Sequence, residues 1–164
     1  MKKYLISFAF TLLTVAFMNA QKTPGYIPLA SFNKDTQQYL ITNFENQKDK
    51  YIGKPIGMIF NDLELEIKGQ SRINQSPRNK NYFAGVILYL YNVDLRGKLS
   101  LEQKRTFYSE KKNYGLYIET VQPINWLDYI AVLRQANVDI HWSNNMKTFY
   151  APFIVKSIST NATP

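Results

Sequence analysis

The chain has 164 residues, of which 20 are basic, 12 are acidic, one is histidine and none is cysteine, giving a formal net charge of +8. Without cysteine it can form no disulfide, thiol nucleophile or iron–sulfur cluster, and one histidine excludes metal sites built from several imidazoles. The length suits one domain. The function classes that remain need neither thiols nor clustered histidines.

Residues 1–20 predict a cleaved secretory signal peptide. Lys2 and Lys3 form a positive start, and an uncharged, mostly apolar run from Tyr4 to Met18 leads to a small residue, Ala20. The run is shorter than the roughly 20 residues that span a bilayer. We therefore expect cleavage after Ala20, export to the periplasm or the medium, and no transmembrane segment afterwards. An uncleaved N-terminal anchor is the alternative.

The mature chain is expected to begin with an extended lead-in, residues 21–32, followed by a single α+β domain, residues 33–160. Residues 33–50 have the apolar spacing of a helix that starts at Asn33, and Gly53 stops it. Pro55 suits the first position of a second, short helix. The apolar positions of these two helices are Tyr39, Leu40, Phe44, Ile56, Ile59, Phe60 and Leu63.

Strands are expected from residue 65 onward. Residues 65–68 alternate and open a first strand, and the polar residues 69–81 predict a loop. Residues 82–93 are apolar and rich in β-branched and aromatic side chains, which predicts a central strand covered on both faces. A further strand is expected over 114–122, ended by Pro123.

The last elements are a helix and a strand. Residues 125–136 predict a helix that opens at Asn125 or Asp128, and residues 149–159 predict the final strand. Residues 96–113 fit a helix, a hairpin or a mobile loop. The order of elements predicts an α+β fold with a mostly antiparallel sheet of about four strands and two or three helices on one face. A parallel doubly wound fold fits poorly, because strands and helices do not alternate.

One stretch resembles a known group of proteins. Tyr51-Ile52-Gly53-Lys54-Pro55-Ile56, with Asn61-Asp62-Leu63 after it, is similar to a pattern in small, uncharacterised exported proteins of Bacteroidetes-type bacteria. The resemblance covers residues 50–67 and, more loosely, the final strand. It implies a secreted or periplasmic α+β domain, and it supplies no activity and no catalytic residues.

Basic side chains interleaved with aromatic ones predict a binding surface within residues 96–114. Such a surface suits an anionic glycan or an anionic lipid surface, whereas export argues against nucleic acid. Trp142, next to two asparagines, is a further exposed aromatic candidate for stacking on a sugar or a protein. Trp126 instead has the helical spacing of a core residue. The expected surface residues are Arg96, Lys98, Lys104, Arg105, Phe107, Tyr108, Lys111, Lys112 and Trp142.

Catalytic alternatives have weaker patterns. Asp139, His141 and Ser143 offer an acid, a base and a hydroxyl without a nucleophile elbow around the serine. Three carboxylates occur at Asp62, Glu64 and Glu66, but alternation with leucine and isoleucine places them on a solvated face, where burial cannot tune them. The sequence identifies no catalytic residue, cofactor site or metal ligand.

These patterns predict an exported, non-catalytic binding module of the bacterial envelope, which contacts an envelope protein or an anionic polymer. Two alternatives stay open. One is a small glycan or cell-wall hydrolase that uses Glu64 and Glu66. The other is an inhibitor-like protein that inserts a loop, residues 96–113 or 142–148, into an enzyme.

Overall fold

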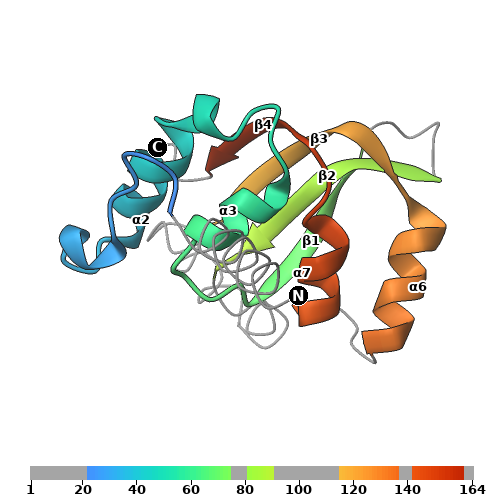
Figure 1. Cartoon of the computed structure of the whole chain (residues 1–164). Coiled ribbons are helices and arrows are strands. Elements are labelled where there is room, and N and C mark those ends of the chain that lie inside the picture. The colour runs from blue at the N-terminus through green and yellow to red at the C-terminus, as the bar shows by residue number, and fades with distance from the viewer. Residues whose placement is uncertain (1–21, 75–80, 91–114, 137–141, 161–164) are drawn as a thin grey trace, which may run out of the picture.

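The computed structural model describes residues 22–74, 81–90, 115–136 and 142–160, and its sheet is an antiparallel meander. Each strand pairs with the next one along the chain, so the order is β1-β2-β3-β4 (Figure 1). The strands are β1 (Gly69–Asn74), β2 (Tyr82–Tyr89), β3 (Gly115–Asn125) and β4 (Val155–Thr160).

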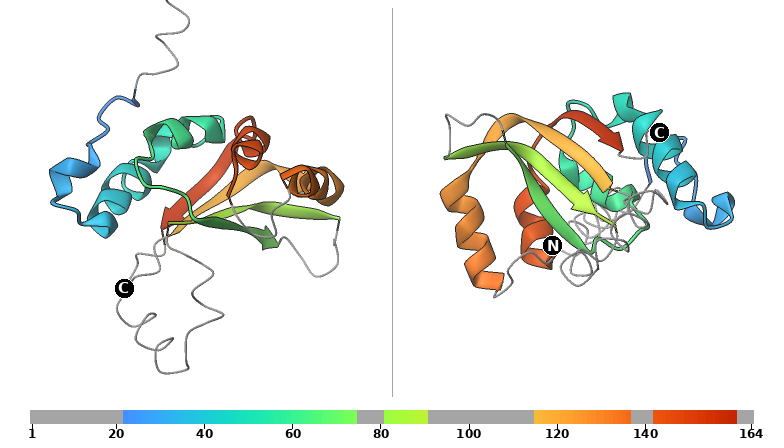
Figure 2. Two further views of the ribbon diagram at one scale, coloured as in Figure 1. Left: turned by 90° about the horizontal axis from the view of Figure 1, so that it is seen from below. Right: turned by 180° about the vertical axis from the view of Figure 1, so that it is seen from behind.

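The helices lie on one side of this sheet (Figure 2), which confirms the predicted α+β class. Helices α6 and α7 follow each other between β3 and β4, and α7 contacts both α6 and α3. The helical elements are η1 (Leu29–Phe32), α2 (Thr36–Leu40), the π-helical turn η2 (Ile41–Glu45), η3 (Lys48–Lys50), α3 (Ile56–Asp62), α6 (Trp126–Ala136) and α7 (Asn144–Tyr150).

The core lies between the sheet and the helices. Val86, Ile118 and Ile158 are opposite one another on the three strands β2, β3 and β4, and Leu88 faces Leu116 in the next row. All five are buried, because alternate residues of a strand point to one face of the sheet. The helices cover this face with Tyr39, Leu40, Phe44, Ile56, Ile59, Phe60, Tyr129, Met146 and Tyr150.

Three of the expected elements are confirmed. β2 is a central strand, α3 begins directly after Pro55, and α6 begins after Asn125, whose Oδ1 accepts a hydrogen bond from the Leu127 N–H at 2.7 Å. Pro55 itself is the N-cap of α3 rather than its first residue. The expected single helix over 33–50 is wrong, because the chain divides there into α2, η2 and η3.

The start of that helical region also differs from the expectation. Asn33 adopts a left-handed conformation, φ 51°, after η1, and Asp35 is the N-cap, accepting from the Gln38 N–H at 2.9 Å. A left-handed residue cannot begin a helix, so the cap moves two residues on. The lead-in, residues 21–32, is not extended throughout, because its end forms η1.

Three strand boundaries were predicted wrongly. β1 falls in the expected loop because its inward residue is polar: Gln70 is fully buried, and its amide replaces the apolar side chain that marks a strand. β3 does not end at Pro123 but continues to Asn125. The β2–β3 register shifts between Phe83 and Gly85, so Pro123 lies in a bulge, where the missing proline N–H costs no hydrogen bond between the strands. Residues 149 and 150 end helix α7, and β4 starts only at Val155.

Among the residues that the structure describes, no helix is long and apolar enough to cross a membrane. The expected signal peptide, residues 1–20, and the segment 96–113 lie outside the described residues.

Buried tyrosines hold the core together through their hydroxyl groups. Tyr51 Oη donates to Asp62 Oδ2 at 2.9 Å, and Tyr150 Oη donates to Gln70 Oε1 at 3.2 Å. Burial raises the pKa of both phenols well above the ordinary value, and hydrogen bonding to Asp62 adds to the rise at Tyr51. Burial likewise raises the pKa of Tyr26 and Tyr39, whose hydroxyls are 2.9 Å apart.

These raised pKa values predict that the fold is lost in alkali. Below about pH 10 these phenols are neutral in both the folded and the unfolded chain, so their full contribution to stability is present. Above that pH the phenols ionise only in the unfolded chain, which favours unfolding. The free energy of unfolding should be flat to about pH 9 and then fall by about 1.4 kcal/mol per pH unit for each such tyrosine. Urea unfolding between pH 8 and 11 measures this, and Tyr150→Phe should reduce the slope. Equal stability of the wild type at pH 8 and 11 would contradict it.

Candidate functional site

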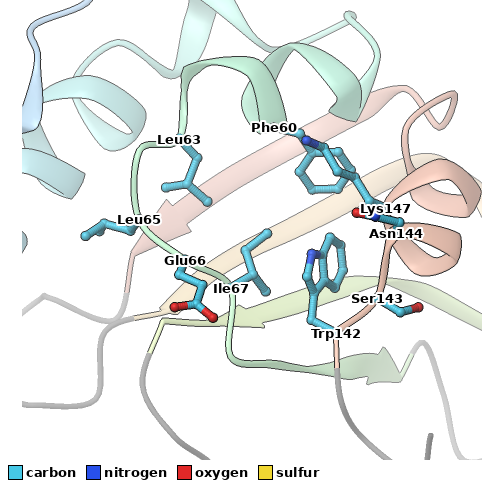
Figure 3. Close-up of a pocket in the computed structure, with 9 residues that line it drawn as sticks. All are labelled: Phe60, Leu63, Leu65, Glu66, Ile67, Trp142, Ser143, Asn144 and Lys147. Carbon is cyan, nitrogen blue, oxygen red and sulfur yellow. The ribbon is translucent and has the colours of Figure 1, made fainter.

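A pocket of about 450 Å³ opens between the segment that leaves α3 and the start of α7 (Figure 3). Its size falls in the range of small-ligand sites, about 300–1,000 Å³. Apolar and aromatic side chains make up its walls, with polar and charged ones among them. It is lined by Phe60, Leu63, Leu65, Glu66, Ile67, Trp142, Ser143, Asn144 and Lys147.

Three aromatic rings meet at the pocket, and two of them, Phe60 and Trp142, line it. Trp142 lies parallel to Tyr150, with centroids 6.2 Å apart and an angle of 3° between the planes. Phe60 meets Trp142 edge to face, with centroids 5.4 Å apart. Tyr150 is fully buried and Phe60 nearly so, whereas Trp142 is half-buried. The two buried rings therefore fix the orientation of Trp142 at the surface.

The indole of Trp142 has a polar edge that faces the pocket. In Figure 3 its nitrogen lies on the side turned toward Ile67 and Glu66. Within the described part of the chain, the indole N–H has no hydrogen-bond acceptor. Since an indole N–H usually has a partner when it is buried, this donor is available to a ligand in the pocket.

Helix α7 places two polar side chains at the rim. Ser143 is its N-cap, with Oγ accepting from the Met146 N–H at 3.3 Å, and Met146 and Tyr150 turn into the core. The helical repeat then leaves Asn144 and Lys147, three residues apart, on the exposed side. The side chain of Lys147 forms no ion pair with any residue that the structure describes.

The opposite rim comes from residues 63–68, where half-buried and exposed residues alternate as the sequence predicts, although the segment is not a strand. Ile67 packs against the core and Glu66 is exposed. The Glu66 carboxylate pairs with Lys68, so its negative charge is already matched.

The two carboxylates of the hydrolase alternative do not share the pocket. Glu64 lies outside it and accepts from the Leu29 N–H at 2.9 Å, with Lys22 at 3.9 Å. Glu66 lines the pocket and pairs with Lys68. Each carboxylate is thus held by a different part of the chain, and nothing brings them to opposite sides of one cleft, as glycoside hydrolysis requires.

The third carboxylate of the Asp62, Glu64 and Glu66 group was expected on a solvated face, and this is wrong for Asp62. Asp62 is 1% exposed, because it still belongs to α3 and follows Ile59 by three residues on the same helix face. Its two oxygens accept from the Thr23 N–H at 3.0 Å and the Tyr51 hydroxyl at 2.9 Å. It anchors the lead-in to the helices and does not reach the pocket.

Of the residues expected to form a binding surface, the structure describes Trp142 and places it in the pocket wall. Trp126 packs against the core as expected, with Arg72 stacked 4.1 Å above its ring. Asp139 and His141 of the triad-like pattern lie outside the described residues, as do the basic and aromatic residues of 96–114, namely Arg96, Lys98, Lys104, Arg105, Phe107, Tyr108, Lys111 and Lys112.

The pocket was not predicted as a unit. Trp142 stood out in the sequence, but Phe60 and Ile67 were expected only as core positions of another segment. Asn144 and Lys147 fell in the loop 142–148 of the inhibitor-like alternative, and a loop there is wrong, because Asn144–Tyr150 forms helix α7. One local signal was present. Ser143 three residues before Met146 is the spacing of an N-cap, and a helix from there places Lys147 one turn after Ser143.

Among the described residues, no group of three or more histidine, aspartate or glutamate side chains is arranged to hold a metal ion. Comparison of the chain with protein-family models, with curated proteins and with solved structures finds no match.

Proposed function

We propose that the chain is an exported, non-catalytic binding module of the bacterial envelope, and that it holds its ligand in the pocket between α3 and α7. The observation that carries this proposal is Trp142, oriented by Phe60 and Tyr150 so that its free N–H edge faces the pocket. Aromatic and apolar side chains beside polar groups that can orient a ligand are features of small-molecule binding sites.

Export rests on the sequence. The positive start, the short apolar run and the small residue at position 20 support secretion, and the resemblance of residues 50–67 supports a bacterial envelope location. Binding rather than catalysis is supported by the rim of the pocket, where Glu66 and Lys147 are both exposed and Glu66 is paired with Lys68.

Titration of the exported chain with a panel of soluble envelope polysaccharides, followed by calorimetry, tests the proposal. We expect at least one member to bind, and Trp142→Ala to weaken that binding at least about tenfold, the effect of losing a central aromatic contact. Leu127→Ala is the control, because it removes a side chain that is 73% exposed and lies outside the pocket.

Trp142→Phe separates binding from folding. It keeps an aromatic ring between Phe60 and Tyr150 but removes the N–H. The melting temperature should therefore stay close to that of the wild type, while binding of the ligand weakens. The proposal fails if no polysaccharide binds, or if Trp142→Ala folds and binds as tightly as the wild type.

A further inference from the structure

The charges around the pocket identify the kind of ligand that it suits. Two charged side chains line it, Glu66 and Lys147. Glu66 is matched by Lys68, whereas Lys147 forms no ion pair within the described part of the chain. The unpaired charge at the pocket is therefore the positive charge of Lys147, and a ligand with one negative group would form an ion pair with it.

The uncharged groups of the pocket narrow the range of suitable ligands further. The Trp142 N–H and the Asn144 amide donate hydrogen bonds, and the Asn144 carbonyl accepts them, which matches neighbouring hydroxyl groups. Between these polar groups lie the rings of Trp142 and Phe60 and the side chain of Ile67, which suit a flat, apolar ring face. A pyranose ring with a carboxylate combines all three features: an apolar face, hydroxyls at its edge and one negative charge.

We propose that the pocket binds an acidic sugar, a hexuronate unit of a glycan, with its carboxylate at Lys147 and its ring against Trp142. This inference rests on the proposed function and specifies its ligand. Removal of residues 1–20 takes away Lys2 and Lys3 and leaves 18 basic and 12 acidic residues, a formal net charge of +6, which favours the approach of such a polyanion at long range.

Oligomers of galacturonic acid and their carboxyl-reduced, neutral counterparts provide a matched pair of probes. The wild-type chain should bind the acidic oligomer more tightly than the neutral one, and rising salt should weaken only the acidic one. Lys147→Gln should lower affinity for the acidic oligomer by up to about fivefold, as expected for one exposed ion pair, and should leave affinity for the neutral oligomer unchanged. Lys54→Gln, an exposed lysine outside the pocket, is the control.

The outcomes separate this inference from the broader function. Binding that depends on Trp142 but is equal for the acidic and neutral oligomers, or unaffected by Lys147→Gln, overturns the acidic-sugar assignment and leaves the binding module standing. Binding of an acidic aromatic peptide in place of either oligomer also overturns it. If no probe or polysaccharide binds in a manner that depends on Trp142, both proposals fail.

Discussion

Gly85→Ala should destabilise the fold by at least about 4 kcal/mol or prevent folding altogether, the largest effect we expect from a single methyl group here. A Cβ at this position would lie 2.0 Å from the carbonyl oxygen of Ile118 and 2.7 Å from the Cα of Glu119. Both are backbone atoms of β3, so no side chain can turn away to relieve the clash.

The close approach follows from the register of the sheet. Phe83 pairs with Ile124, but Gly85 pairs with Glu119, so β3 bulges outward between these two points. Thr120 Oγ1 donates to the Ala84 carbonyl at 3.0 Å and holds the bulge against β2. The missing side chain at position 85 is therefore what permits β2 and β3 to pair on both sides of the bulge.

Gly57→Ala is the matched control. Gly57 lies inside α3, where a Cβ would meet three atoms of Ala151, the carbonyl oxygen at 3.4 Å, the Cβ at 3.5 Å and the Cα at 3.9 Å, which are ordinary contacts. Since alanine favours a helix over glycine by about 0.5–1 kcal/mol, this variant should be as stable as the wild type or slightly more so. Urea unfolding followed by circular dichroism compares the two, and a Gly85→Ala midpoint equal to that of Gly57→Ala would contradict the argument.

The parts of the fold that the sequence predicts are those with regular apolar spacing. The repeat of Ile56, Ile59 and Phe60 predicts α3, and the apolar run around Val86 predicts the central strand. Both elements are confirmed, because apolar spacing within one element is a short-range pattern. The expected cover on both faces of β2 is wrong for the described residues: Val86 and Leu88 are buried under the helices, whereas Ile87 and Tyr89 on the other face are half-buried.

The elements that were missed depend on partners distant in the sequence. Gln70 can face the core in β1 because Tyr129 accepts from its amide at 2.7 Å and Tyr150 donates to it at 3.2 Å. Helix α7 has only seven residues, two of them asparagine, and it is fixed by burial of Met146 and Tyr150. Such short helices depend on tertiary packing more than on local propensity.

The same reasoning applies to the pocket. The sequence singled out Trp142, but its ring is oriented by Tyr150 of α7 and Phe60 of α3, and the second contact joins segments far apart in the chain. Glu64 and Glu66 looked equivalent in the alternating pattern, and only the fold separates one at the lead-in from the other at the pocket. Pattern alone identifies residue types, whereas a site requires their convergence.

Asp62→Ala should lower the free energy of unfolding by about 3 kcal/mol, because it leaves two donors without an acceptor inside the protein. The Thr23 N–H and the Tyr51 hydroxyl bond to separate oxygens of the carboxylate. Asp62 also ends α3, where the helix dipole disfavours a negative charge, so these two hydrogen bonds are what keep the carboxylate there. Urea unfolding measures the loss.

Asp62→Asn tests the arrangement of the two donors. Asparagine keeps the shape but has one acceptor oxygen, so one of the two donors must face an NH₂ group. Asp62→Asn alone should therefore lower the free energy of unfolding by about 1–3 kcal/mol. Either single change, Asp62→Asn or Tyr51→Phe, removes the hydrogen bond from the Tyr51 hydroxyl to the Asp62 carboxylate. Because the double variant loses this bond only once, it should be more stable than the sum of the two single changes implies, with a coupling of about 1 kcal/mol.

Loss of the Asp62 contacts should also release the lead-in. Thr23 is tied to the helices through Asp62, while Ile27 is held separately by Asn43, which accepts from its N–H at 2.8 Å and donates to its carbonyl at 2.9 Å. Limited proteolysis should therefore cleave Asp62→Ala at Lys22 faster than the wild type. Asp49→Asn, at an exposed aspartate, should change stability by less than about 0.5 kcal/mol. If Asp62→Ala matched Asp49→Asn in both assays, the buried carboxylate would not be what holds the lead-in to the helices.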